Sequence, residues 1–348
     1  MLSISRRSWI ARASALAASA ALPMRPATAA DFYDGKILHF LVGIPPGGSY
    51  DLMPRFLASH IAKYIPGNPK IVVENMPGAG SLTMMNYLYY KAPHDGTVIG
   101  FPMNTMLLEP SLGLVGGGAG GPHFDLSRMA WVGTPGQDPS VAWIAGASPV
   151  RTFEDLRTRG ATFGTSNAGA DGTVLANLCN KLLGTKIKIV SGYAGTAEYV
   201  GAFEKGEVDG AVTLYAALMA SHSDWIKSGR IRLLAQFGTE RSPELPDIPT
   251  GVELATNDDA RAMLRFYGTK FSAAYPVVLP PDVPADQIRI IRQAFAKTMQ
   301  DPDFKAKIES LHVSGGAVSP ETVEAFVRSI DNAPPALVEK LRAVLQAK

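Results

Sequence analysis

The chain has 348 residues, of which 46% are hydrophobic and 18% are charged, and these values exclude a disordered or fibrous protein. This length is enough for two domains of ordinary size. The formal net charge of +2 becomes −2 once the four arginines of the N-terminal segment are set aside, so the remaining chain lacks the basic excess of a nucleic-acid-binding protein.

The N-terminal segment is typical of an export signal. Arg6 and Arg7 precede an Ala- and Leu-rich stretch, and residues 27–29 have the small side chains of a cleavage site. We expect a cleavable signal peptide with cleavage near Ala29 or Ala30. The arginine pair suggests twin-arginine export, although an ordinary Sec signal that contains two arginines fits the same residues.

From residue 37 onward, a strand, a glycine-rich loop and a helix follow one another four times. The expected strands are residues 37–44, 70–74, 161–165 and 186–191, the loops 45–51, 75–81, 166–172 and 192–196, and the helices 52–65, 82–91, 173–183 and 197–205. This alternation predicts parallel α/β sheets, in which ligands bind beyond the carboxyl ends of the strands. The loops form two pairs that are well separated in the sequence, which indicates two lobes with two loops each.

The remaining elements continue the pattern with fewer signals. Further strands are expected at 210–214 and after the turn near 227, and helices at 286–299, from Ser319-Pro320 onward, and at 336–347. Residues 113–122 formally contain G-x-G-x-x-G, but no helix follows directly, so we expect a surface loop and no dinucleotide site there.

The first glycine-rich loop shows what these loops can do. A loop between a strand and a helix directs free backbone N–H groups at whatever lies above the strand end. Asp51 is expected to cap the following helix, which would put Pro54 at its third position, where a missing N–H costs nothing. One such loop alone is more often only a tight turn, but four of them favour a shared anion-binding site.

The residues that would indicate catalysis or metal binding are missing from the sequence. The six histidines have no metal-pair spacing, and H-E-x-x-H, G-x-S-x-G and a P-loop are all absent. Asp51, Asp171 and Asp209 could act as acids in principle, but the first two stand at expected helix starts, where capping is the commoner role. We therefore expect no enzyme, no metal and no cofactor.

Several of these stretches resemble one family. P-P-G-G-S-Y-D at 45–51 and V-E-N-M-P-G-A-G at 73–80 resemble signatures of the tripartite tricarboxylate transporter substrate-binding proteins, the Bug family. D-G-T at 95–97, the segment 201–210 and L-P-D-I-P-T at 245–250 are similar to further motifs of that family, in the same order. The resemblance extends over essentially the whole chain after the signal.

The resemblance implies an α/β fold of the periplasmic binding protein type II kind, with a ligand cleft between two lobes. The implied organisation is a signal peptide at 1–30, lobe 1 at 31–136 plus 250–348, and lobe 2 at 137–249. It also implies a periplasmic monomer that binds a small organic carboxylate, mainly through backbone N–H groups, and delivers it to the permease subunits of a membrane transporter. Nucleic acid is not an expected partner. A sensory or scaffolding protein that presents its closed form to a receptor, or an exported enzyme, remains an alternative.

The loops and the resemblance together define the expected ligand site. The candidate ligand residues are Pro46, Gly47, Gly48, Ser49, Asp51, Ala79, Gly80, Ser81, Thr165, Ser166, Gly172, Thr173, Tyr193, Gly195, Thr196 and Asp209. Among the departures from the family pattern, Ser81 and Met84 stand where glycines are usual, and the tyrosine that often follows D-G is absent. We expect the Ser81 hydroxyl to add a donor close to the carboxylate, and Tyr193 either to stack on a planar acid or to pack in the core.

Overall fold

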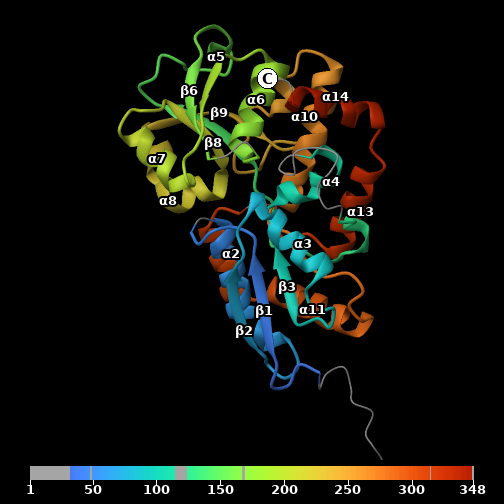
Figure 1. Cartoon of the computed structure of the whole chain (residues 1–348). Coiled ribbons are helices and arrows are strands. Elements are labelled where there is room, and N and C mark those ends of the chain that lie inside the picture. The colour runs from blue at the N-terminus through green and yellow to red at the C-terminus, as the bar shows by residue number, and fades with distance from the viewer. Residues whose placement is uncertain (1–31, 48, 114–123, 167–168, 314, 347–348) are drawn as a thin grey trace, which may run out of the picture.

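The computed structural model describes residues 32–47, 49–113, 124–166, 169–313 and 315–346. The described chain is divided into two parts, one above the other, each built on a five-stranded sheet (Figure 1). We call the part around the sheet that contains β1 the first lobe, and the part around the other sheet the second lobe. The expected signal segment and most of the loop 113–122 lie outside the described residues. Among the helices that are described, none is long and apolar enough to cross a membrane.

The first lobe has a mixed sheet. Its strands in spatial order are β2 (Lys70–Asn75), β1 (Ile37–Val42), β3 (Val98–Phe101), β10 (Val277–Leu279) and β4 (Ala130–Gly133). β1 runs parallel to β2 and β3, whereas β10 runs antiparallel to β3 and β4. The expectation of purely parallel sheets was therefore wrong, because β10 returns from the second lobe and enters this sheet in the opposite direction.

The second lobe repeats the arrangement. Its strands in spatial order are β7 (Ile187–Val190), β6 (Ala161–Gly164), β8 (Gly210–Leu214), β5 (Ser140–Ala145) and β9 (Ile231–Phe237). β6 is parallel to β7 and β8, and β5 is antiparallel to β8 and β9. β5 follows directly after the chain leaves the first lobe, so again the strand that arrives from the other lobe is the antiparallel one.

Helices cover both sheets and bury the apolar faces that their sequences predict. Around the first sheet lie α2 (Ser49–Ile61), η2 (Ala62–Tyr64), η3 (Ala79–Ser81), α3 (Leu82–Tyr90), η4 (Asn104–Leu107), α4 (Glu109–Leu112), η5 (Leu126–Arg128), α11 (Ala285–Thr298), α12 (Pro302–Ser310) and α13 (Pro320–Asp331). With the second sheet or beside it lie α5 (Asp155–Thr158), α6 (Asp171–Leu183), α7 (Thr196–Glu204), α8 (Tyr215–Lys227), α9 (Gly251–Leu254), α10 (Asp258–Gly268), η6 (Thr269–Ala273) and α14 (Pro335–Gln346). Most elements of the four expected units match the observed bounds within two residues.

The start of α2 differs from the expectation. The helix begins at Ser49, so Asp51 lies in its first turn and Pro54 lies inside the helix. The glycine-rich loop is therefore shorter than the sequence suggests, because the chain turns into helical geometry directly after the glycines. At α13 the expected cap is confirmed, since the Ser319 side chain accepts a hydrogen bond from the N–H of Thr322.

The C-terminal part of the chain contributes elements to both lobes. α10 and α14 pack against each other and against α6 of the second lobe, although we assigned residues 250–348 to the first lobe. Leu341 of α14 is fully buried by this packing. The positions of the lobe boundaries stay a prediction, because the helices after β9 pack on one lobe and the strand β10 joins the other.

The two lobes are joined where the chain crosses between them. The N–H of Asp138, before β5, donates to the Phe271 carbonyl, which lies just before β10, at 3.3 Å. The Tyr275 hydroxyl donates to the Asp138 carboxylate at 2.6 Å. Burial raises the pKa of Asp138 to about 7. The two crossing segments are thus tied to each other through one buried carboxyl group.

Candidate ligand-binding site

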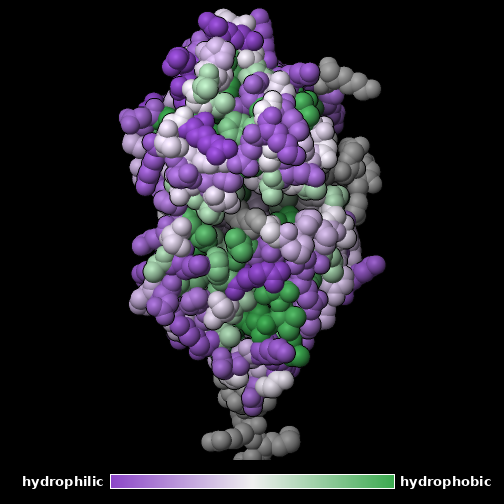
Figure 2. Space-filling view, turned by 90° about the vertical axis from the view of Figure 1, so that its left-hand side faces the viewer, coloured by the Kyte–Doolittle hydropathy of each residue, from purple (hydrophilic) through white to green (hydrophobic). Residues whose placement is uncertain are grey.

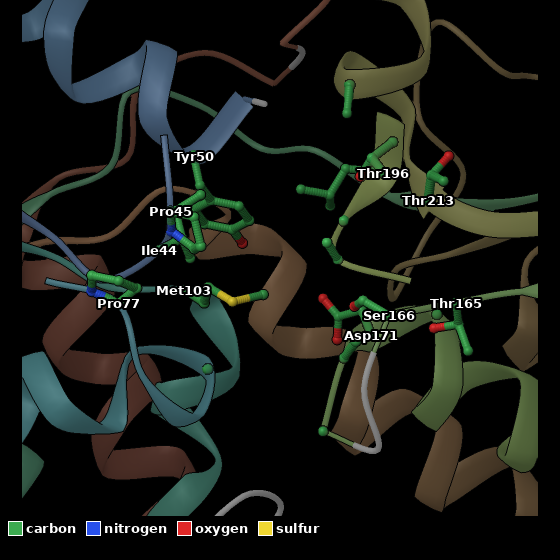
Figure 3. Close-up of a pocket in the computed structure, with 18 of the residues that line it drawn as sticks. Ile44, Pro45, Tyr50, Pro77, Met103, Thr165, Ser166, Asp171, Thr196 and Thr213 are labelled. Carbon is green, nitrogen blue, oxygen red and sulfur yellow. The ribbon is translucent and has the colours of Figure 1, made fainter. Parts of the chain in front are cut away.

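A cavity of about 400 Å³ lies between the lobes. This volume is within the range of small-molecule sites. The cavity lies beyond the carboxyl ends of β1, β2, β6 and β8, and all four glycine-rich loops reach it. Figure 2 shows the surface hollowed at the level where the two lobes meet, and Figure 3 shows the residues of the two walls facing each other across the gap.

The wall from the first lobe is made mainly of backbone. Residues 43–47 follow β1, and residues 77–80 follow β2. All four residues from 78 to 81 have positive φ angles, between 43° and 147°. The left-handed conformation costs a residue with a Cβ about 1–2 kcal/mol, so the turn stores strain at Ala79 and Ser81. Strained backbone of this kind is concentrated at ligand clamps and other functional sites.

Asp51 holds the first loop in shape from behind. Its buried carboxylate accepts hydrogen bonds from the Gly47 N–H at 3.0 Å, from Arg55 Nη2 at 2.9 Å and from Asn75 Nδ2 at 2.8 Å. Asn75 also donates to the Ile44 carbonyl at 2.9 Å, so β2 is joined to the same loop. Burial alone would raise the pKa of Asp51, but the donated hydrogen bonds outweigh it and hold the pKa below its usual value. Asp51 does not line the cavity.

Ser81 is also placed behind the wall. It occupies the residue before α3 but makes no capping hydrogen bond through its side chain. Its fully buried hydroxyl donates to the Gly43 carbonyl at 3.2 Å and accepts the Met103 N–H at 3.0 Å. The expectation that this hydroxyl would face the ligand was therefore wrong, because two backbone groups of the first lobe already use it.

The wall from the second lobe presents more side chains. Thr165 and Ser166 follow β6, Thr196 begins α7, and Thr213 lies at the end of β8. Figure 3 shows these residues with Asp171 on the side of the cavity opposite Tyr50, Pro77 and Met103. The Tyr199 hydroxyl donates to Thr196 Oγ1 at 3.1 Å, and this bond orients one of the hydroxyls in the wall.

Among the described residues of the cavity wall, Asp171 is the one that has a charged side chain. The Tyr267 hydroxyl donates to its Oδ1 at 2.8 Å, and Lys270 forms an ion pair with the same oxygen. Lys270 is fully buried, whereas 12% of the Asp171 side chain is exposed. The expectation that Asp171 serves as a helix cap was wrong: Ala170 occupies the cap position of α6, and the Asp171 side chain bonds to residues of the segment 267–270.

No lysine, arginine or histidine lines the described part of the cavity. Burial raises the pKa of Tyr199 to about 12 and the pKa of Tyr50 well above its usual value, so both phenols are neutral at pH 7. The first turns of α2, α6 and α7 begin at or beside the cavity, and the first N–H groups of a helix have no partner within it. The arrangement can therefore bind an anion through backbone dipoles.

The structure brings together most of the candidate residues. Those that line the cavity are Pro46, Gly47, Ala79, Gly80, Thr165, Ser166, Gly172, Gly195 and Thr196. Gly48 lies outside the described residues, and Ser49 begins α2. Thr173 lies behind the wall, where its hydroxyl is 2.8 Å from that of Thr165.

Two further candidates lie elsewhere. Tyr193 faces a separate open groove beside Glu198 and Lys205, and its ring centroid is 6.4 Å from that of Tyr199. Asp209 precedes β8, and its carboxylate accepts the Thr162 N–H at 2.7 Å. Because β6 and β8 are parallel, this position is at the amino ends of the strands, the edge opposite the cavity. Asp209 is therefore not part of the cavity wall.

Several wall residues were missed in the sequence. Thr213 lies near the end of β8, a strand whose bounds were expected, so the rule that placed the glycine-rich loops could have included it. Met103 follows β3, a strand that its short sequence did not reveal. Tyr50 and Tyr199 lie on helices, and nothing in their local pattern distinguishes them from core residues.

A metal centre has no support in the described chain. Within residues 32–346, apart from the stretches left undescribed, no group of three His, Cys, Asp or Glu side chains is close enough to hold an ion.

The sequence and the fold have counterparts among known proteins. A "UPF0065 protein in gbd 5'region" of Cupriavidus necator is 25% identical over 344 residues, which cover 97% of this chain and 98% of the relative. The structure of MatC from Rhodopseudomonas palustris with bound malate has a TM-score of 0.64 and 16% identity, over 89% of this chain and 99% of that one. The structure of the periplasmic binding protein BugD has a TM-score of 0.66 and 21% identity, over 90% of this chain and 98% of that one.

These likenesses confirm the two-lobed periplasmic binding protein fold that the sequence motifs imply. The model of the tripartite tricarboxylate transporter family receptor matches residues 54–342, which is more than half of the chain. The chain therefore belongs to the family of tripartite tricarboxylate transporter receptors, which are solute-binding proteins.

Proposed function

We propose that this protein captures a small organic carboxylate between its two lobes and delivers it to a tripartite-type membrane transporter. The observation that carries the proposal is the convergence of four loops on one cavity of about 400 Å³. In its described part, this cavity offers helix N-termini and hydroxyl groups but no cationic side chain. Backbone dipoles hold an anion without a permanent counter-charge, and such a site can release its ligand to a partner.

The expected affinity follows from the number of donors. A hydrogen bond to a charged group contributes on the order of 1.5–3 kcal/mol. Several such bonds, reduced by the cost of ordering the ligand, correspond to binding in the micromolar range. MatC, which shares the fold, is known with bound malate, and this supports a carboxylate as the ligand class.

The proposed contacts come from both lobes. On the first lobe, the N–H groups at Ala79 and Gly80 and those in the first turn of α2 would bind the carboxylate, with Pro46 and Gly47 lining the cavity beside them. On the second lobe, Thr165, Ser166, Gly172, Gly195 and Thr196 would complete the site. We propose that Asp51 and Ser81 act indirectly, by fixing the loops that carry the donors.

The cellular setting is part of the same proposal. We infer that the signal segment directs export, with cleavage near Ala29 or Ala30, and that the mature monomer works in the periplasm. Its partners would be the permease subunits of the transporter, and it would bind its ligand without converting it. A time course with each bound acid tests the last point, since accumulation of a product would show turnover.

A thermal-shift screen tests the ligand class. The full mature chain is heated with a panel of mono-, di- and tricarboxylates, including hydroxy, amino and aromatic acids, and with uncharged amides of the same skeletons as controls. A ligand that binds the native state raises the melting temperature. We expect at least one acid to raise it where its amide does not. Equal shifts for acid and amide, or no shift with any acid, would contradict the proposal.

Closure of the lobes is tested by small-angle scattering with the acid that gives the largest shift. A ligand that contacts both walls should reduce the radius of gyration at saturation. An unchanged radius would mean that the acid binds one wall only, and would contradict capture between the lobes.

A further inference from the structure

Asp171 gives the ligand cavity an acidic group. It lies in the first turn of α6 and, among the described residues of the wall, no other side chain carries a charge. Figure 3 shows its carboxylate directed into the gap between the two walls. An anion-binding cavity would be expected to exclude such a group, because an ionised carboxylate only accepts hydrogen bonds and repels other anions.

The Asp171 carboxylate is held in place from behind. Lys270, which is fully buried, forms an ion pair with Oδ1, and the Tyr267 hydroxyl donates to the same oxygen at 2.8 Å. The Lys270 ammonium also lies 4.4 Å from the ring centroid of Tyr267 and 4.6 Å from that of Phe271. Removal of one partner of a buried ion pair leaves the other charge uncompensated. The ion pair and the hydrogen bond from Tyr267 therefore fix the Asp171 carboxylate in this position.

The second carboxylate oxygen is left for the cavity. Both hydrogen bonds of Asp171 go to Oδ1, and Oδ2 accepts none from any other residue that the structure describes. With 12% of the side chain exposed, the open side of this carboxylate is the side toward the cavity. Oδ2 is thus an acceptor with a fixed position, which a ligand can reach.

The charge of Asp171 also affects where in the cavity each group of a ligand is favoured. This charge lies in the first turn of α6 and offsets the positive end of that helix, as the charge of Asp51, which lies behind the wall, does in α2. The first turn of α7 also has an acid, Glu198, but this side chain is exposed, does not line the cavity and accepts the Ala194 N–H. A ligand group with an N–H or O–H is therefore favoured beside Asp171, and a ligand carboxylate is favoured at donors of the wall that lie away from it.

We propose that Asp171 determines specificity: the ligand is a carboxylate that also carries a hydrogen-bond donor, a hydroxyl or an ammonium group, and plain carboxylates of the same skeleton are disfavoured. This inference rests on the proposed function, since it assigns the ligand class of the same cavity. In this proposal, Asp171 accepts a hydrogen bond from the donor group of the ligand, and the backbone of the first lobe binds the carboxylate.

Matched acids test the proposal in the unmodified mature protein. Calorimetric titrations compare succinate with malate and aspartate, glutarate with 2-hydroxyglutarate and glutamate, and phenylacetate with mandelate and phenylglycine. We expect the hydroxy or the amino member of at least one set to bind about tenfold or more tightly than its plain counterpart. The two arms of each set distinguish a hydroxyl from an ammonium ligand.

Two variants locate the preference at Asp171. Asp171→Asn removes the charge but keeps the shape, and the double variant Asp171→Asn with Lys270→Met also removes the buried counter-charge, in case the single variant does not fold. We expect the preference to fall to about threefold or less in whichever variant folds, through weaker binding of the donor-bearing acid. Asp209→Asn is the matched control: the same change at the opposite end of the strands should leave the preference unchanged.

The outcomes separate the inference from the proposed function. If plain acids bind as tightly as their hydroxy and amino counterparts, or if the preference survives in the Asp171 variants, the role of Asp171 is overturned while carboxylate binding stands. If no acid of any kind binds, the proposed function itself fails, and the inference fails with it.

Discussion

The two aspartates at the starts of α2 and α6 have the same sequence context and opposite roles. Each follows a glycine-rich loop and lies in the first turn of a helix. Asp51 points back into the first lobe, where it binds the Gly47 N–H and the side chains of Arg55 and Asn75. Asp171 lies in the cavity wall, with Lys270 and Tyr267 behind it. A residue's neighbours in space, and not its place in a motif, therefore decide whether it supports a loop or lies in the cavity wall.

The same contrast extends to the two walls. The first-lobe wall presents mainly backbone in a strained turn, and the side chains that organise it are buried behind it. The second-lobe wall presents hydroxyl groups and one carboxylate. A backbone wall can serve any carboxylate, whereas a wall of side chains can distinguish one ligand from another. Substitutions in the walls and behind them test this division.

Removal of the Asp51 carboxylate should have the largest effect. In Asp51→Ala the Gly47 N–H and Asn75 lose a buried acceptor, and Arg55, whose side chain is 41% exposed, loses a partner that solvent replaces in part. We expect the free energy of unfolding to fall by about 2–4 kcal/mol and ligand binding to weaken with it, because the loop loses its support. Urea titration and calorimetry measure the two effects. A stable variant with normal affinity would show that Asp51 does not organise the wall.

The pH dependence of this effect has a definite sign. The pKa of Asp51 in the folded protein is held below its usual value, so its ionised form stabilises the fold at pH values above the ordinary carboxyl pKa of about 4. This contribution is lost as the pH falls through the lowered folded-state pKa. The difference in unfolding free energy between the wild type and Asp51→Ala should therefore be constant between pH 6 and 7 and shrink below about pH 4. A difference that grows on acidification would contradict the assignment.

A side chain at Gly195 should block the second-lobe wall without harming the fold. Gly195 has an extended backbone, with φ of 177°, and a Cβ built there meets no atom within 4 Å. We expect Gly195→Val to weaken binding about tenfold or more while the melting temperature changes little. Gly201→Val is the control, because Gly201 also has open space around it but lies further along α7 and does not line the cavity. Equal affinities for the two variants would remove Gly195 from the site.

Two substitutions at Ser81 separate strain from hydrogen bonding. Ser81→Ala keeps a Cβ at φ of 82° and leaves the Met103 N–H without its acceptor, whereas Ser81→Gly loses the same bond but relieves the left-handed strain. We expect both to destabilise the protein, with Ser81→Gly more stable than Ser81→Ala by about 1 kcal/mol. Denaturant titrations of the two variants give the difference directly. The reverse order would mean that the turn is not strained at this position.

The smallest effect is expected at Asp209. Asp209→Asn keeps an oxygen acceptor for the Thr162 N–H at the edge of the sheet opposite the cavity. The unfolding free energy should fall by less than about 1 kcal/mol, with no change in ligand affinity. Any clear loss of affinity would show that the second lobe transmits changes from one edge of its sheet to the other.

Local sequence determined the repeating units and the family. Strands such as Gly210–Leu214 and the glycine-rich loops were predictable because a short apolar run and a turn sequence have strong local preferences. The motifs at 45–51 and 73–80 pointed to the family, which the match over residues 54–342 confirms. From the same signals it follows that several loops lie at the carboxyl ends of strands.

Which residues meet in the cavity depends on tertiary packing. The antiparallel courses of β5 and β10 come from the two crossings between the lobes, which no local pattern records. Lys270 reaches Asp171 from a position 99 residues further along the chain, so their pairing depends on how α10 and η6 pack beside α6. The sequence therefore determined where the donor-bearing loops are. The packing of distant segments decided that Ser81 faces inward and that Asp171 lies in the wall.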